Sequence, residues 1–201
     1  MKRIYILLTL FLTLLSVSAQ QPMKAREILD KTAETYRKSG GISIVFGGSQ
    51  NGKLLLKGDK FHLITDEIET WFDGKTQWSY LKQNDEVNIT TPTPEELQAI
   101  NPYALVSAYR QGFDYHYKGT TTYNGKQGET VVLSPKQKQE LKSLTLTVSK
   151  TYEPLYISIQ TSGGQKQEFI IRSFRPNLNL HDNAFRFNPK EYPQVEIIDM
   201  R

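Results

Sequence analysis

The sequence predicts an α+β domain built on one large antiparallel sheet, and three observations support this prediction. A single stretch near the N-terminus, 22–39, has helical periodicity. Short segments rich in aliphatic, aromatic and threonine residues follow it, and Asn-Gly, Asp-Gly or Gly-Gly turns separate several of them. One break in this rhythm, at 92–111, contains prolines and has the pattern of short helices.

The N-terminus has the three-part layout of a secretory signal peptide. A short positive region and an apolar run, 1–15, precede Ala19, a small residue suited to cleavage. The apolar run is shorter than the ~20 residues that cross a bilayer as a helix. We therefore expect cleavage after Ala19, with a signal peptide at 1–19 and a single domain at 20–201 in the periplasm.

The composition argues against several classes of protein. The sequence has no cysteine, so we expect neither disulfides nor a lipid-modified N-terminal cysteine. The formal net charge is +4, and it becomes +2 without Lys2 and Arg3, which is too mild for a nucleic-acid-binding surface. No second apolar span follows, so we expect a protein that is not membrane-anchored.

The helix predicted at 22–39 begins with Pro22 and stops at Gly40 and Gly41. Its less polar positions recur near the helical period and form one stripe. They are Ala25, Ile28, Leu29, Thr32, Ala33 and Tyr36. Such a stripe predicts a helix that packs one face against the sheet.

Twelve candidate strands follow from the turn signals and the alternation of apolar and polar residues. They are 42–48, 53–57, 60–66, 68–72, 76–82, 85–91, 113–119, 128–134, 142–150, 155–161, 166–174 and 195–199. The alternation is clearest where Leu144, Leu146 and Val148 point to one face, and Ile157 and Ile159 repeat it. One face of the sheet is therefore apolar and must be covered.

The interruption at 92–111 is a second candidate for that cover. Pro94 at a helix start, followed by Glu95 and Glu96, suits the positive end of a helix dipole. Pro102 opens a second short helix. Two short helices separated by proline are typical of a flap.

No motif indicates catalysis or metal binding. His62, His116 and His181 share no metal-ligand spacing, and each is expected on a polar surface. Metalloprotease, serine-hydrolase and phosphate-loop signatures are absent, as is a nucleophilic cysteine. We therefore expect no enzyme activity, no cofactor and no metal.

Aromatic side chains are abundant, with 11 Tyr, 9 Phe and 2 Trp. Trp71, Phe72, Trp78 and Tyr80 surround one hairpin turn, and alternate residues of 113–117 are aromatic. Cross-strand packing in a β-core explains such residues as well as a lipid trough or a sugar-stacking platform does. Composition alone leaves these interpretations open.

Four motifs, in this order, resemble the outer-membrane lipoprotein carrier family (LolA). They are GKLLLKGDKFHL at 52–63, TWFDGKTQWSY at 70–80, NPYALVSAY at 101–109 and AFRFNPKEYPQVEIID at 184–199. Each motif alone is weak, and the ordered set covers nearly the whole mature chain.

The resemblance implies a curved antiparallel sheet that forms an unclosed, or half, β-barrel, with helices as a lid over an apolar hollow. It implies a periplasmic carrier that binds lipoprotein acyl chains and shuttles lipoproteins from the inner to the outer membrane. The implied partners are acylated lipoproteins, an inner-membrane lipoprotein-releasing complex and an outer-membrane acceptor. Such a shuttle is expected to be a monomer.

The inward-facing side chains of this half-barrel are the candidate ligand-binding residues. From the strands they are Ile44, Phe46, Leu54, Leu56, Phe61 and Leu63. From the lid they are Leu97, Ile100, Tyr103, Leu105 and Val106, and from the first helix Ile28, Leu29 and Tyr36. For each of them, core packing fits the pattern as well as ligand contact does.

The sequence departs from the family after Lys57. Many members carry Arg-Pro at the next two positions, and that arginine can bond to the lid, whereas this chain has Gly58 and Asp59. We therefore expect a lid that opens more easily or one that is latched elsewhere.

Three other functions remain open. A lipoprotein sensor or a glycan-binding module could use the same half-barrel, and a carrier could take other amphiphiles. A glycan binder would show aromatics along a solvent-open groove, so the alternating leucines and isoleucines favour lipid.

Overall fold

The computed structural model describes residues 21–94, 96–97, 109–110 and 112–201. An N-terminal helix spans 21–38, as the sequence predicts. All twelve predicted strands are present, and two short 3-10 turns precede the last of them. The elements are β1 (Ile42–Gly48), β2 (Gly52–Lys57), β3 (Lys60–Thr65), β4 (Ile68–Phe72), β5 (Gln77–Leu81), β6 (Glu86–Thr90), β7 (Phe113–Tyr123), β8 (Lys126–Pro135), β9 (Leu141–Val148), β10 (Pro154–Thr161), β11 (Lys166–Arg175), η1 (Asp182–Phe185), η2 (Pro189–Glu191) and β12 (Glu196–Asp199).

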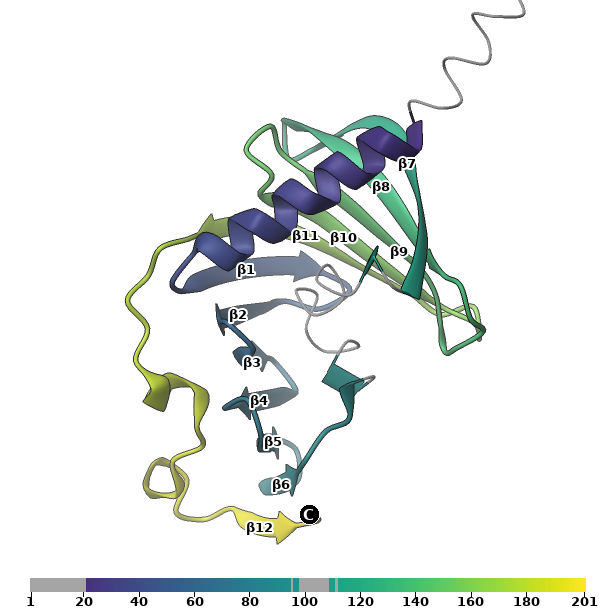
Figure 1. Cartoon of the computed structure of the whole chain (residues 1–201). Helices are drawn as coiled ribbons and strands as arrows, with labels where there is room; N and C mark the ends of the chain where they lie inside the picture. Colours follow the sequence, from purple (N-terminus) through teal and green to yellow (C-terminus); the bar gives the residue numbers. More distant parts are fainter. Residues whose placement is uncertain (1–20, 95, 98–108, 111) are drawn as a thin grey trace, which may run out of the picture.

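The described strands form one curved sheet in the order β12-β6-β5-β4-β3-β2-β1-β11-β10-β9-β8-β7 (Figure 1). The two edge strands, β12 and β7, do not pair with each other, so the sheet does not close into a barrel. The central contact joins β1 to β11, which brings the first and second halves of the chain together. The predicted α+β half-barrel is therefore confirmed.

One pairing differs from the expected antiparallel sheet. Strand β12 lies parallel to β6, with Ile197 opposite Val87. The reason is the path of the chain. Residues 176–195 connect β11, in the middle of the sheet, to β12 at its edge. A connection of that length allows parallel pairing, whereas a short hairpin does not.

The helix packs on the inner face of the sheet, the face that carries the apolar residues of β8 and β9. Figure 1 shows it lying across β7 to β11 and reaching β1. Buried residues of the helix, of the sheet and of the segment before β7 form a first core cluster, which consists of Ala25, Ile28, Leu29, Tyr109, Phe113, Val131, Leu133, Leu144, Leu146, Val148 and Ile157. None of the described helical residues belongs to a helix that is long and apolar enough to span a bilayer.

A second core cluster occupies the inner face of the other half of the sheet. It consists of Tyr36, Ile42, Ile44, Phe46, Leu54, Leu56, Phe61 and Phe72. Tyr36, at the end of the helix, is the only helical member of this cluster among the described residues. The helix therefore links the two halves of the inner face.

The outer face of β3 to β6 is covered by the C-terminal segment, defined here as residues 176–195. Trp71 and Val87 of the sheet are buried with Phe187 of this segment. The ring of Tyr192 lies edge-on to the ring of Trp71, with centroids 5.7 Å apart. This cover makes the outer face of the first half a third small core.

The position of His62 corrects the expectation that it lies on an exposed polar surface. Its side chain is only 13% exposed, its Nε2 lies 2.7 Å from Glu69 Oε1, and its ring stacks on Trp71. The strand alternation placed His62 correctly on the polar face, but the C-terminal segment then covers that face. His116 and His181 are exposed, as expected.

Candidate ligand-binding cavity

A cavity of about 210 Å³ lies on the inner face, where β1 to β3 meet β10 and β11. Its wall is formed by Tyr36, Ile44, Phe46, Gln50, Leu54, Leu56, Leu63, Thr65, Ile157, Ile159, Gln167, Phe169 and Ile171. The strands therefore contribute aliphatic and aromatic side chains from both halves of the chain, and the helix contributes one tyrosine.

Strand register explains why these side chains meet. Ile44 lies opposite Leu54, and Leu54 lies opposite Leu63, so the three form a row across β1, β2 and β3. Directly paired residues of antiparallel strands share a face, and every second residue along each strand returns to it. On the other side of β1, the ring of Phe46 meets the ring of Phe169 edge-on at 5.5 Å.

The cavity wall carries no charged side chain among the described residues; its polar members are Gln50, Thr65, Gln167 and Tyr36. Burial raises the pKa of the Tyr36 hydroxyl above its ordinary value, so this group is uncharged throughout the physiological range. The Tyr36 ring also lies edge-on to Phe174, with centroids 5.9 Å apart. A neutral wall of this kind favours hydrocarbon over charged ligands.

Six of the predicted ligand-binding residues line this cavity: Tyr36, Ile44, Phe46, Leu54, Leu56 and Leu63. Phe61 belongs to the second core cluster instead, where it is fully buried against Phe72 at 5.4 Å between ring centroids. Ile28 and Leu29 belong to the first core cluster and are not among the residues that line the cavity.

The lid residues predicted from the sequence are described only in part. Leu97 is half-buried and packs against the second core cluster. Ile100, Tyr103, Leu105 and Val106 lie outside the described residues.

The far wall of the cavity was missed by sequence reasoning. Ile157 and Ile159 of β10, and Phe169 and Ile171 of β11, complete it. The alternation of Ile157 and Ile159 already indicated an apolar face. What no local pattern shows is that β11 pairs with β1, which places these residues beside Ile44 and Phe46.

Polar contacts fix the helix above the second half of the sheet. The Lys24 ammonium group donates hydrogen bonds to Tyr117 at 3.0 Å and to Glu129 at 3.1 Å. Further along the helix, Lys31 donates to the hydroxyl of Tyr152 at 3.1 Å. These bonds bridge the helix to β7, β8 and the β9–β10 turn.

Both ends of the segment between β6 and β7 have defined anchors. At its start, Thr93 and Glu96 form a reciprocal capping box: the Thr93 amide donates to Glu96 Oε2 at 2.7 Å, and the Glu96 amide donates to Thr93 Oγ1 at 3.3 Å. At its end, the carboxylate of Asp30 on the helix accepts hydrogen bonds from Tyr109 and Arg110. Burial raises the pKa of Asp30, but these hydrogen bonds outweigh it, and the pKa is lowered overall.

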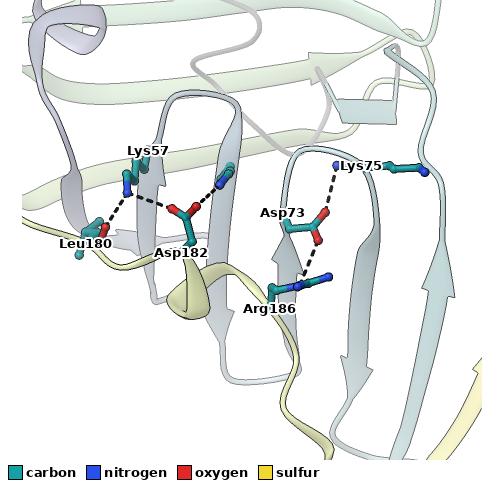
Figure 2. Close-up of polar contacts among 7 residues, drawn as sticks. Lys57, Asp73, Lys75, Leu180, Asp182 and Arg186 are labelled. Carbon is teal, nitrogen blue, oxygen red and sulfur yellow. Dashed lines mark hydrogen bonds and ion pairs between the residues drawn. The ribbon is translucent and has the colours of Figure 1, made fainter.

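Lys57, beside the position where the family arginine was expected, bonds to the C-terminal segment. Its ammonium nitrogen lies 2.8 Å from the Leu180 carbonyl oxygen and 2.9 Å from Asp182 Oδ1 (Figure 2). Arg186 of the same segment pairs with Asp73 at the β4–β5 turn, with 3.2 Å between Nε and Oδ2. Two hairpin turns therefore hold this segment.

Comparisons with known proteins agree with this architecture. A family model described as outer membrane lipoprotein carrier protein LolA matches residues 15–165. An uncharacterized protein of Methanocaldococcus jannaschii is 25% identical to this chain in an alignment that covers 93% of it. The match spans only 58% of the length of that relative.

Solved structures resemble this chain at low sequence identity. An uncharacterized conserved protein of Thermus thermophilus has a TM-score of 0.62 at 15% identity, and the match covers 88% of this chain and 99% of that one. LprF of Mycobacterium bovis has a TM-score of 0.48 at 11% identity, over 80% of this chain and 97% of LprF. The Thermus protein therefore shares the fold of this chain over almost its whole length.

Proposed function

Because this chain belongs to the family of outer membrane lipoprotein carrier proteins, we propose that it is a periplasmic carrier which holds the acyl chains of lipoproteins in the inner-face cavity. It takes up lipoproteins released at the inner membrane and delivers them to the outer membrane. Its partners are then the acylated cargo, an inner-membrane releasing complex and an outer-membrane acceptor. No step of this cycle requires a catalytic residue.

The neutral, apolar wall of the cavity is the observation that carries this proposal. An acyl chain of about 16 carbons in water costs roughly 0.8 kcal/mol per methylene, or about a dozen kcal/mol in all. The side chains of Ile44, Leu54 and Leu63 offer a dry surface that removes this cost. A carrier must also release its cargo, so most of the affinity has to come from non-directional apolar contacts that an acceptor can match.

The size of the cavity adds a condition to the proposal. A volume of about 210 Å³ is below the roughly 300–1,000 Å³ of pockets that enclose a drug-sized ligand. We infer that acyl chains enter by displacing side chains of the wall. Phe46 and Phe169 meet edge-on across β1 and β11, and their rings are among the largest side chains in the wall. Their rotation widens the cavity without breaking the β-sheet hydrogen bonds.

The test is co-purification of cargo. The mature chain is purified from the periplasm of cells that overproduce a triacylated lipoprotein, and bound species are identified by mass spectrometry. We expect the lipoprotein to accompany the wild type and to be lost in Leu63→Asp, because a carboxylate in the cavity wall must be desolvated when an acyl chain enters.

Ile197→Asp is the matched control, since Ile197 is 46% exposed on the edge strand β12, far from the cavity in the strand order. This variant should retain the cargo. If the wild type is recovered empty while the lipoprotein stays in membranes, the carrier proposal fails, and a sensor or glycan-binding module becomes the better interpretation.

A further inference from the structure

One row of side chains on the inner face of the sheet changes from apolar to polar between β3 and β4. Leu63 lies opposite Thr70, Thr70 opposite Ser79, and Ser79 opposite Asn88. This polar row continues the apolar row of Ile44, Leu54 and Leu63 directly across the sheet. In a neighbouring row the change comes one strand later, because Phe61 lies opposite Phe72 and Phe72 opposite Gln77.

The polar residues lie within reach of a ligand held in the cavity. Adjacent strands are about 4.8 Å apart. The backbone of Thr70 is therefore about 5 Å from that of Leu63 in the cavity wall, and the backbone of Ser79 is about 10 Å from it. These polar residues therefore lie on the same face as the cavity wall and next to it in the strand order, and Thr70 is itself buried.

Gln77 leaves one hydrogen-bonding group unused. Its Nε2 donates to Ser79 Oγ at 3.1 Å. Its Oε1 is buried and has no hydrogen-bond partner among the described residues. A buried acceptor without a donor is unfavourable, and a ligand that brings an N–H or O–H group removes that penalty. The nearby carboxylate of Glu86, which accepts from Asn88 Nδ2 at 2.7 Å, also disfavours an anionic group.

We propose that the inner face of β4, β5 and β6, with Thr70, Gln77, Ser79 and Asn88, is a second binding site that takes the amide-bearing head of an acylated protein. This inference rests on the proposed function, because it assumes that the acyl chain occupies the cavity. The cavity then holds the hydrocarbon, and a peptide N–H next to it displaces the groups that cover Gln77 Oε1 and donates a hydrogen bond to this oxygen. Recognition of the head distinguishes a lipoprotein from a membrane lipid with the same chains.

Two probes with the same acyl chains test this site. One is a synthetic lipopeptide with two palmitoyl chains on a glyceryl-cysteine followed by four residues, and the other is dipalmitoylphosphatidylcholine, which has no N–H or O–H donor. Both are titrated into the mature protein in the same detergent below its micelle concentration. The wild type should bind the lipopeptide more tightly.

The test variant is Gln77→Leu. Loss of one hydrogen bond should weaken lipopeptide binding roughly 3- to 10-fold and leave phosphatidylcholine binding within about twofold. The urea midpoint should not fall, because the substitution also removes the unpaired buried acceptor. Ser79→Ala, which removes the hydroxyl that orients the Gln77 amide, should weaken lipopeptide binding in the same direction. Gln83→Leu, on the exposed β5–β6 turn, is the matched control and should change neither affinity.

The outcomes separate the two proposals. Equal binding of both probes by the wild type, or equal effects of Gln77→Leu on both, overturns the second site and leaves the carrier function standing. Failure of the wild type to bind either probe overturns the carrier function and the second site with it.

Discussion

The carboxylate of Asp182 lies 2.9 Å from the ammonium nitrogen of Lys57, and this ion pair fastens the C-terminal segment to the β2–β3 turn. The second carboxylate oxygen of Asp182 lies 2.7 Å from Lys60 on the same hairpin. One acidic residue therefore holds two cations, and the Leu180 carbonyl adds a third contact. Both lysines are thereby committed to the C-terminal segment.

Asp182→Asn is expected to loosen this attachment at neutral pH only. Hydrogen bonds from Lys60 and Lys57 lower the pKa of Asp182 from 3.8 to about 2. Because the folded state has the lower pKa, the stabilisation is complete above about pH 4 and is lost as the pH falls through about 2. The urea midpoint of the variant should therefore lie slightly below that of the wild type at pH 7, and the two should converge by about pH 2. Asp59→Asn, on the exposed turn between the lysines, should match the wild type at both pH values.

Phe187→Ala should destabilise the outer face. Phe187 is 8% exposed and lies edge-on to Trp71, with ring centroids 5.5 Å apart. Its removal leaves a cavity and should lower the free energy of unfolding by about 3–4 kcal/mol. Both tryptophans of the chain, Trp71 and Trp78, lie in or against this cluster, so their fluorescence emission should shift to longer wavelength. An unchanged emission maximum would contradict the assignment of this face to the C-terminal segment.

Tyr192→Phe is a milder substitution in the same cluster. It keeps the ring against Trp71 and removes only the hydroxyl, which donates to Glu69 Oε2 at 3.1 Å. The expected loss in unfolding free energy is about 1 kcal/mol, measured by urea titration. A loss as large as that of Phe187→Ala would mean that the hydrogen-bond network, not ring packing, holds the segment.

Leu29→Ala and Leu63→Ala should separate core packing from ligand contact. Leu29 is fully buried on the face of the helix that packs against the sheet, so its truncation should cost about 2–5 kcal/mol of unfolding free energy and leave palmitoyl-chain affinity unchanged. Leu63 is half-buried in the cavity wall, so its truncation should cost less stability and reduce affinity several-fold. Equal effects of the two variants on affinity would argue against a localised binding cavity. Met23→Ala, at a residue 65% exposed on the same helix, should change neither quantity.

Gly52→Ala should reduce the space available in the cavity. A methyl group at Gly52 would lie 2.5 Å from the tip of the Phe46 ring and 2.6 Å from the Ile64 carbonyl oxygen. The Phe46 ring can rotate into the cavity but the carbonyl cannot move freely, so we expect weaker lipid binding together with a stability loss of about 1–3 kcal/mol. Gly40→Ala, where nothing lies within 4 Å of the added methyl group, should leave binding unchanged.

Local patterns were sufficient to predict the strands and the N-terminal helix. Each strand is bounded by a turn signal or by a change in alternation, and both are properties of neighbouring residues. The Asp73-Gly74 turn is an example, because Asp73 Oδ1 accepts from the Thr76 amide at 2.9 Å and so closes its own hairpin. Information of this kind needs no knowledge of distant segments.

Long-range pairing explains what the sequence did not predict. The partner of β1 is β11 and the parallel partner of β6 is β12, and no feature of these strands specifies either choice. The far wall of the cavity and the covered environment of His62 both follow from these pairings. The six cavity residues that were predicted come from β1 to β3 and the helix end, which are consecutive in the chain and whose shared face can be derived from alternation.

The crossing of the C-terminal segment also sets an order of events in time. During synthesis the N-terminal part of the chain is made first, so β1 to β6 are present early. Strand β1 still lacks its partner β11, and the outer face around Trp71 still lacks its cover, until residues 166–195 have been synthesised. Contacts between segments so far apart in sequence form slowly, because a long loop must close first. The first half of the sheet can therefore complete its folding only after almost the whole polypeptide has been synthesised, which keeps the chain unfolded for longer.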